Sequence, residues 1–363
     1  MDRARIGVIG TGWWATQFHI PSLMEYGRAE LVAFADPDAR NLAAADARWP
    51  GRRLHEDYRE LLSAGEVDGV VIAVPHAFHY EIARAALEAG VHALVEKPMV
   101  LRADEAWDLV ERARGRDLHL MVGYTYQFTR HARRARELVG GGRIGELLFV
   151  SGLFASMVEA YYRGRPEEYR EVFEFPVTGP GASTYSDPAV AGGGQGQTQI
   201  THAMGMVFWV TGRRATEVSA LMERFDLPVD LVDAIAYRLD NGAVGTMGST
   251  GSLRPHQPQQ QEFRYYGSEG FVLQDFLRGT LTVHFNDGTV EAVPDLAEDE
   301  IYPAHLPARA LVDLILDGGE NLAPPEPGAI TVEFLEAAYR SAETGRPVRP
   351  DELGASATKG ETR

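Results

Sequence analysis

A glycine-rich turn near the start of the chain could hold an anionic ligand. The segment "GTGWWA" follows the apolar run "RIGVIG" and places Gly10, Gly12 and Ala15 in the spacing G-x-G-x-x-A. Gly10 allows a tight turn, Gly12 lets the backbone approach a pyrophosphate, and Ala15 permits a helix to pack closely on a strand. The N-terminus of that helix attracts the anion. We therefore expect a dinucleotide to contact this turn, including Trp13 and Trp14.

An acidic residue at the end of the next apolar run indicates which dinucleotide fits. Asp36 ends "ELVAFAD", where a carboxylate can accept hydrogen bonds from an adenosine ribose. The same charge repels a 2′-phosphate, so NAD is the expected cofactor and NADP is disfavoured. Arg40 lies close enough in sequence to weaken this discrimination. A turn residue before Pro37 is the alternative interpretation of Asp36.

Polar residues also follow two later apolar runs. "VVIAVPHAFH" places Pro75, His76 and His79 after one predicted strand, and "LVEKPM" places Glu96 and Lys97 after the next. Because the carboxyl ends of parallel strands line the ligand crevice, we expect all five residues beside the cofactor. A lysine at this position is a candidate for chemistry, with a surface charge as the alternative. The proline after Lys97 determines how the chain leaves the strand, and its peptide bond could be cis.

A third group of polar side chains lies in "GGGQGQTQITHAMG". If a helix begins within the glycines, Gln195, Thr198 or Gln199, and His202 share one face. The apolar residues on another face would pack on a sheet and turn the polar face toward the nucleotide. Uncharged amides there can donate to and accept from sugar hydroxyls. Spacing alone favours a structural histidine, with glutamines that cap or solvate the helix.

Two patterns describe the elements that must position these residues. Over residues 1–123, short apolar runs alternate with helical periodicity such as "FHYEIARAALEAG", which predicts a Rossmann domain with a doubly wound parallel sheet. Over residues 124–350, strand patterns follow one another across turns such as Asn241-Gly242, which predicts a mainly antiparallel open sheet. Helices are expected at about 306–316 and 329–344, and residues 351–363 are expected to be a disordered tail.

These motifs together resemble the Gfo/Idh/MocA family of nicotinamide-dependent sugar and inositol oxidoreductases. The resemblance rests on "GTGWWA", Asp36, "VPHAFHYEIARAALEAGVHALVEKPM", "MVGYTYQF", and the glycine run with His202 and "FWVTG". It covers nearly the whole chain and implies hydride transfer between NAD and a secondary alcohol of a sugar, inositol or related cyclic polyol. It also implies that His202 and Lys97 are catalytic, with His202 exchanging the hydroxyl proton and Lys97 stabilising the developing alkoxide; an exchange of these two roles is the alternative.

One position departs from the family pattern. The family has an acidic residue four positions before the histidine, where this chain has Thr198, and a threonine cannot stabilise an imidazolium by charge. Two hypotheses follow. Either His202 is a weaker base that shares proton removal with Lys97 or with a carboxylate such as Asp187, or the substrate differs from a simple polyol.

Aromatic residues are the remaining candidates for substrate binding. A long irregular segment between Met157 and Gly192 is rich in them and is expected to act as a lid, with aromatic rings stacked on sugar faces. A subunit contact or a plain surface loop is the alternative. The predicted substrate contacts are Tyr126, Tyr161, Tyr185, Gln195, Thr198, Gln199 and His202, and Tyr162 and Arg163 are further candidates. The "RPHQPQQQ" segment, residues 254–261, is expected to be a solvated loop, and contact with a neighbouring subunit's site is the alternative.

Two other functions stay open within the same fold. A redox-neutral enzyme would oxidise a sugar hydroxyl transiently, allow elimination of a glycosidic group, and return the hydride from NAD that it never releases. A non-catalytic, ligand-sensing protein would bind a small molecule at the same site.

Composition restricts the other classes of function. The formal net charge of -17 argues against a nucleic-acid surface. The chain has no cysteine, and no carboxylate completes a ligand set with His76 and His79, so no metal is expected. With no apolar window of membrane-spanning length and no signal peptide after Met1, we expect a cytoplasmic protein. An open sheet face needs a cover, which predicts a homodimer or homotetramer.

Overall fold

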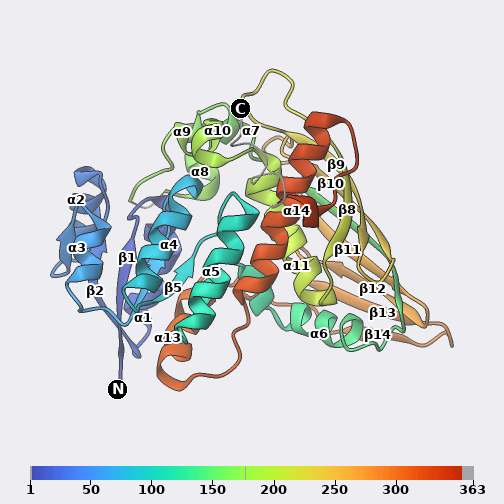
Figure 1. Cartoon of the computed structure of the whole chain (residues 1–363), viewed down its shortest axis with the longest axis horizontal. Helices are drawn as coiled ribbons and strands as arrows, with labels where there is room; N and C mark the ends of the chain where they lie inside the picture. The colour runs from blue at the N-terminus through green and yellow to red at the C-terminus, as the bar shows by residue number, and fades with distance from the viewer. Residues whose placement is uncertain (1, 176, 354–363) are drawn as a thin grey trace.

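Six short apolar runs form a parallel sheet in the order β3-β2-β1-β4-β5-β6. Figure 1 shows this sheet in a computed structural model, which describes residues 2–175 and 177–353. The strands are β1 (Ala4–Ile9), β2 (Ala29–Ala35), β3 (Arg53–His55), β4 (Gly69–Ile72), β5 (His92–Val95) and β6 (Leu120–Val122). All four residues of β4 are buried, because helices cover both faces of a doubly wound sheet. The prediction of a Rossmann fold is confirmed.

The two faces of this sheet carry different helices. One face packs on α3 (Tyr58–Ser63), α4 (His79–Glu88) and α5 (Ala103–Gly115). The other packs on α1 (Ile20–Glu25), α2 (Ala39–Arg48) and α13 (Leu306–Asp317). Helix α13 comes from the part of the sequence that was assigned to the second domain. It returns to the first sheet because Leu311 and Val312 complete an apolar cluster with Ile6 and Val8.

The second sheet has eight strands in the order β14-β13-β12-β11-β7-β10-β9-β8. They are β7 (Leu147–Ala155), β8 (Ala215–Glu223), β9 (Val232–Leu239), β10 (Val244–Thr250), β11 (Gln260–Gly267), β12 (Gly270–Asp275), β13 (Thr280–Phe285) and β14 (Val290–Val293). Neighbouring strands pair antiparallel except β7 and β10. Burial alternates along β9, as expected for a sheet with one packed and one open face. The predicted antiparallel sheet is therefore confirmed.

Three helices cover the packed face of the second sheet, as Figure 1 shows. They are α6 (Arg130–Val139), α11 (Thr201–Thr211) and α14 (Pro325–Thr344). Helix α14 also reaches the first sheet, because Ala329 and Val332 join the apolar cluster around α5, while Phe334 and Leu335 pack with the second sheet. This helix therefore packs against both sheets.

Short helices break up the long segment that was expected to be irregular. They are α7 (Glu159–Tyr162), α8 (Arg170–Phe173), α9 (Ser183–Ser186) and α10 (Pro188–Ala191), with a 3-10 turn at Pro166–Tyr169. These helices lie at the top of the view in Figure 1, between the two sheets.

The C-terminal part of the described chain is ordered slightly further than expected. The predicted tail starts at residue 351, but a 3-10 turn spans Pro350–Glu352 and Leu353 is buried. The rest of that tail, residues 354–363, lies outside the described residues. In the described part of the chain, no helix is both long and apolar enough to cross a membrane.

Candidate active site

The glycine turn after β1 has the backbone geometry that a dinucleotide needs. Gly10 has φ of +88°, and a Cβ atom there would lie 2.4 Å from the carbonyl oxygen of Ala73. Only glycine fits such a position. Gly12 differs, because no neighbouring atom lies within 4 Å of where its Cβ would be, which leaves its backbone open to a ligand. Ala15 is fully buried at the start of the helical turn that follows.

Asp36 ties the end of β2 to this turn. Its Oδ2 accepts hydrogen bonds from the backbone nitrogen and the hydroxyl of Thr11, at 2.8 and 3.1 Å, and its Oδ1 accepts one from the nitrogen of Asp38 at 2.9 Å. The guanidinium of Arg40 pairs with Asp38 at 2.7 Å and stays exposed. The cation that was expected to weaken discrimination against NADP therefore forms a surface ion pair in this structure.

The two tryptophans of the turn point in different directions. Nε1 of Trp14 donates to Oε1 of Glu96 at 2.8 Å, which links the turn to the end of β5. The ring of Trp13 packs on aromatic rings of the 157–192 segment, with centroid distances of 5.9 Å to Tyr161, 6.4 Å to Phe173 and 5.2 Å to Phe175. The long segment therefore closes over the glycine turn of its own chain.

Glu96 is a buried carboxylate that carries charge. Besides Trp14, it accepts hydrogen bonds from Nε2 of His19 at 2.7 Å and from the backbone nitrogen of Lys97 at 3.2 Å. Burial alone would raise its pKa, but the hydrogen bond from His19 and the charge of Lys97 outweigh burial and lower it. His19 was not singled out in the sequence, because it lies inside a helical pattern with no motif around it.

The two histidines after β4 support the backbone. Nδ1 of His76 lies 2.9 Å from the carbonyl oxygen of Ala191 in α10. Both ring nitrogens of His79 lie near backbone carbonyl oxygens, Nδ1 at 2.7 Å from Pro98 and Nε2 at 2.9 Å from Val74. His79 was expected to contact the cofactor, but neither of its nitrogens is left for a ligand. It instead holds the ends of β4 and β5 together, and Pro75 is half-buried at the turn between them.

Lys97 reaches across to the second domain. Its Nζ donates a hydrogen bond of 3.1 Å to the backbone carbonyl oxygen of Thr198. Burial lowers the pKa of this ammonium to about 8, against the opposing effect of Glu96. The peptide bond between Lys97 and Pro98 is cis. The rarity of lysine in the sequence also singles out this residue, because the chain contains only two lysines, Lys97 and Lys359, among its 35 Lys and Arg residues.

The segment that carries His202 is helical but begins with a wider turn. Gly196–Ile200 form a π-helical turn, and α11 continues from Thr201. His202 is 8% exposed, and its ring centroid lies 6.0 Å from that of Tyr126 and 6.5 Å from that of Tyr124. Burial, and then the charge of Lys97, lower the pKa of His202 well below its ordinary value. The imidazole is therefore neutral, and its buried Nδ1 has no hydrogen-bond partner among the described residues.

The predicted polar face of this helix does not form. Gln195 is fully buried and points into the second sheet, where its amide contacts the hydroxyls of Tyr162 at 2.9 Å, Ser249 at 2.9 Å and Ser156 at 3.2 Å. The expectation that Gln195 faces the nucleotide is therefore wrong. The 3.6-residue spacing behind it fails, because the π turn closes hydrogen bonds five residues apart.

Thr198 and Gln199 also differ from that prediction. The hydroxyl of Thr198 donates to the carbonyl oxygen of Gly194 at 2.8 Å and contacts the Tyr162 hydroxyl. Gln199 is half-buried. Asp187, considered as a substitute carboxylate, caps α10 by accepting from the nitrogen of Ala189 at 2.9 Å.

Aromatic side chains from distant segments form a continuous series of ring contacts between His202 and His76. Tyr126 contacts Tyr302 at a centroid distance of 5.0 Å, and Tyr302 contacts Trp14 at 6.4 Å. Trp13, the neighbour of Trp14 in the glycine turn, contacts Tyr161. Tyr161 in turn contacts Tyr185 at 5.4 Å, and Tyr185 contacts His76 at 6.0 Å. Tyr302, in a polar stretch before α13, was missed. Gln261 was expected in a solvated loop, but it is a buried residue of β11 and accepts a hydrogen bond from the Tyr126 hydroxyl.

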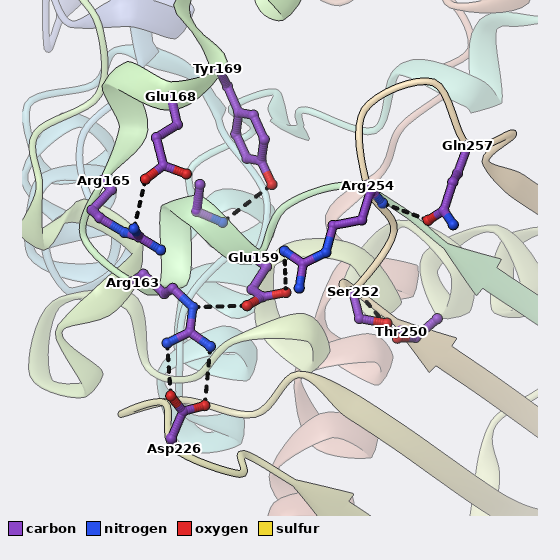
Figure 2. Close-up of polar contacts among 11 residues, drawn as sticks. Glu159, Arg163, Arg165, Glu168, Tyr169, Asp226, Thr250, Ser252, Arg254 and Gln257 are labelled. Carbon is purple, nitrogen blue, oxygen red and sulfur yellow. Dashed lines mark hydrogen bonds and ion pairs between the residues drawn. The ribbon is translucent and has the colours of Figure 1, made fainter.

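Arg163 belongs to a surface network and not to this site. Figure 2 shows its guanidinium between Glu159 at 2.8 Å and Asp226 at 2.9 Å, while Arg254 pairs with the second oxygen of Glu159 at 3.1 Å. These ion pairs tie α7 to the loop after β8 and to the loop after β10. Within the described residues, no three His, Asp or Glu side chains gather closely enough to hold a metal ion.

Comparisons with known proteins agree with this architecture. Residues 4–124 match the model described as an oxidoreductase family with an NAD-binding Rossmann fold, and residues 132–273 match the GFO/IDH/MocA C-terminal domain. The GenD2 structure from gentamicin A biosynthesis, in complex with NAD, superimposes with a TM-score of 0.77 at 25% identity, covering 96% of this chain and 97% of that one.

Two curated relatives are similar over part of their length. The 1-carboxy-3-chloro-3,4-dihydroxycyclohexa-1,5-diene dehydrogenase of Comamonas testosteroni is 29% identical over 249 residues, covering 68% of this chain and 58% of the relative. Inositol 2-dehydrogenase of Corynebacterium glutamicum is 34% identical over 177 residues, covering 48% and 52%. The matched part of this chain thus spans only slightly more than half of each relative.

Proposed function

Because the chain belongs to the Gfo/Idh/MocA family of oxidoreductases, we propose that it transfers a hydride between NAD and a secondary alcohol of a sugar, inositol or related cyclic polyol. The observation that carries this proposal is the hydrogen bond from Lys97 to the carbonyl of Thr198. It joins the end of a Rossmann strand to the helix of His202, so that an amine and a neutral imidazole belong to one site. Hydride loss from an alcohol needs such a proton acceptor beside it.

The residues around the glycine turn fit NAD. Gly12 leaves its backbone open for a pyrophosphate, and Asp36 offers a carboxylate at the end of β2 for ribose hydroxyls. The carboxylate of Asp36 repels a 2′-phosphate, which favours NAD over NADP. Bound NAD would supply the nicotinamide carbon that accepts or returns the hydride.

Lys97 is the better proton acceptor of the two proposed catalytic residues. A group exchanges protons most effectively when its pKa lies near the working pH, and that of Lys97 is about 8. His202 stays neutral over a wide pH range because burial and Lys97 lower its pKa strongly. We assign proton removal to the Lys97 amine and positioning of the hydroxyl to His202. This division agrees with the hypothesis that Thr198, in place of an acid, makes His202 a weaker base.

The aromatic contacts support a ring-shaped substrate. Tyr126, Tyr161, Tyr185 and Tyr302 offer apolar faces on which a cyclic polyol could stack. The names of both curated relatives describe hydroxylated six-membered rings, an inositol and a dihydroxycyclohexadiene. A cyclic compound with adjacent hydroxyl groups is therefore the substrate class that we propose.

One observation favours the redox-neutral alternative. The packing of Tyr161, Phe173 and Phe175 on Trp13 covers the glycine turn with the chain's own aromatic segment. A cofactor under that cover would leave slowly, as an enzyme needs if it returns each hydride to the molecule that supplied it. Transient oxidation of a hydroxyl followed by elimination is then the second candidate.

The test is to purify the full chain, determine its nucleotide content, and follow absorbance of reduced nicotinamide with NAD or NADP and a panel of inositols, aldoses and glycosides. A rise with NAD and one cyclic polyol supports the dehydrogenase. Glycoside cleavage without a net rise, with NAD retained, supports the redox-neutral enzyme. Ligand binding without either reaction would refute both and leave a sensing role.

We also propose that the open face of the second sheet pairs two copies of the chain. Leu148, Leu221, Val244 and Val290 on this sheet are all more than two-fifths exposed. Exposed apolar side chains on several strands of one sheet are typical of an interface. Sedimentation of the chain, and of Leu221→Glu, tests this expectation.

A further inference from the structure

The glycines before and at the start of the π turn lie against residues from outside the helix. A Cβ atom on Gly194 would lie 2.0 Å from the carbonyl oxygen of Asp230, and one on Gly193 or Gly196 would lie 2.1 or 2.5 Å from the Tyr339 hydroxyl. Contacts this short leave no room for a side chain unless Asp230 or Tyr339 shifts. The glycines therefore allow Asp230 and Tyr339 to approach the backbone.

Asp230 uses that approach to bind the turn with both carboxylate oxygens. Oδ1 accepts hydrogen bonds from the nitrogen of Gly194 at 2.7 Å and the hydroxyl of Tyr339 at 2.9 Å, and Oδ2 accepts one from the nitrogen of Gly196 at 2.7 Å. Its backbone oxygen accepts a fourth from the nitrogen of Gln195 at 3.0 Å. Three consecutive backbone nitrogens thus converge on one residue from the loop before β9.

The neighbouring acid does not share this role. Asp233 is 2% exposed, and the backbone nitrogens of Gly194, Gln195 and Gly196 donate to Asp230 instead. Burial and the charge of Asp230 raise its pKa well above the ordinary range, so it is protonated. Asp230 is therefore the acid that accepts hydrogen bonds from the backbone nitrogens.

We propose that Asp230 is a positioning residue for Lys97, acting through the glycine run and the π turn. The turn held at Gly194 and Gly196 presents the carbonyl of Thr198 two residues later, and that carbonyl accepts the hydrogen bond from Lys97. Releasing the glycines lets this carbonyl move away from the ammonium. The catalytic meaning of this link depends on the function proposed above, whereas the link itself does not.

The consequence is measurable without substrate. A hydrogen bond from an ammonium stabilises its charged form, so loss of the Thr198 contact lowers the pKa of Lys97 further below about 8. The carboxylate that directly raises this pKa is Glu96 and not Asp230. An effect of Asp230 on Lys97 would therefore be transmitted by the backbone.

The experiment is a titration of Lys97 by NMR in the full chain labelled with ¹³C and ¹⁵N in lysine. The chain has only two lysines, so the Lys359→Arg variant assigns the spectrum. We expect Asp230→Asn to lower the titration midpoint of Lys97 by about one pH unit or more, because the ammonium loses its hydrogen bond to the carbonyl of Thr198. Tyr339→Phe keeps the charge of Asp230 but removes one of its contacts, and we expect a smaller shift in the same direction.

The matched control is Asp226→Asn, which removes an exposed carboxylate from the same loop and leaves the glycine run untouched. Its Lys97 midpoint should equal that of the wild type. An unchanged midpoint in Asp230→Asn, with a native circular dichroism spectrum, would overturn the proposal. If that variant does not fold, an unchanged midpoint in Tyr339→Phe overturns it instead. Failure of hydride transfer with every substrate would refute the proposed function and leave this result standing.

Discussion

The Nζ of Lys97 lies 3.1 Å from the carbonyl oxygen of Thr198, a residue 101 positions later in the chain. This contact connects the end of β5 in the Rossmann sheet to the helix that carries His202. The partner of the ammonium is a backbone oxygen. The location of this oxygen depends on the conformation of the π turn and not on which side chain occupies position 198.

Replacement of Lys97 should abolish most of the turnover. With Lys97→Met, we expect kcat to fall by about 10²- to 10⁴-fold, because the proposed proton acceptor is lost, while the Kd for NAD changes little. Steady-state kinetics and NAD titration measure the two quantities. Arg84→Gln, which removes an exposed cation paired with Glu88, is the control and should keep full activity.

The pH profile should identify the acceptor. Lys97 must be unprotonated to accept the hydroxyl proton, so kcat/KM for alcohol oxidation should rise with pH through about 8 and then level off. His202→Asn should lower the rate and keep this limb, since a neutral histidine does not titrate there. A limb near pH 6.5 that disappears in His202→Asn would assign the proton transfer to the histidine.

The side chain of Thr198 should matter for stability more than for rate. In Thr198→Val the carbonyl that holds Lys97 is retained, so we expect kcat within a few fold of the wild type. The lost hydroxyl leaves the Tyr162 hydroxyl with one partner fewer, which should lower the free energy of unfolding by about 1–3 kcal/mol. Urea unfolding measures this change, and a loss of activity comparable to that of Lys97→Met would contradict the assignment.

Discrimination between NAD and NADP should depend on Asp36. In Asp36→Asn the negative charge at the ribose end of the site is gone, so the ratio of the two Kd values should move toward NADP by about tenfold or more. Fluorescence titration with each cofactor measures it. Glu30→Gln, on an exposed position of the same strand, is the control for loss of a carboxylate. An unchanged ratio would place the selectivity elsewhere.

The aromatic cover over the glycine turn should slow cofactor release. Each ring pair is worth about 0.5–1.5 kcal/mol, so Trp13→Ala, which removes three contacts of the cover, should raise the dissociation rate of NAD by about tenfold or more. Stopped-flow displacement gives this rate. A double-mutant cycle with Phe175→Ala should show coupling between the two rings, and strictly additive effects would argue against the cover.

Much of the fold could be predicted because it depends on local patterns. Alternation of apolar runs with helical periodicity indicates βα units whatever packs on them, and "GTGWWA" requires a turn that only glycine can make at Gly10. Asp36, Glu96 and Lys97 could be located in the same way, since each follows a strand and the carboxyl ends of parallel strands meet at one edge. Helix α13 could not be assigned to the first sheet, because the apolar residues along one side of a helix do not indicate which surface they pack against.

The sequence by itself determined which residue types reach the edge of the first sheet, because strand ends and tight turns follow from neighbouring residues along the chain. Only the tertiary structure decided what those residues contact. The π turn rotates Gln195 into the second sheet, Asp230 and Tyr339 explain the glycines, and Tyr302 joins the aromatic contacts from the far end of the chain. These arrangements depend on hydrogen bonds and packing between segments far apart in sequence, which periodicity does not encode.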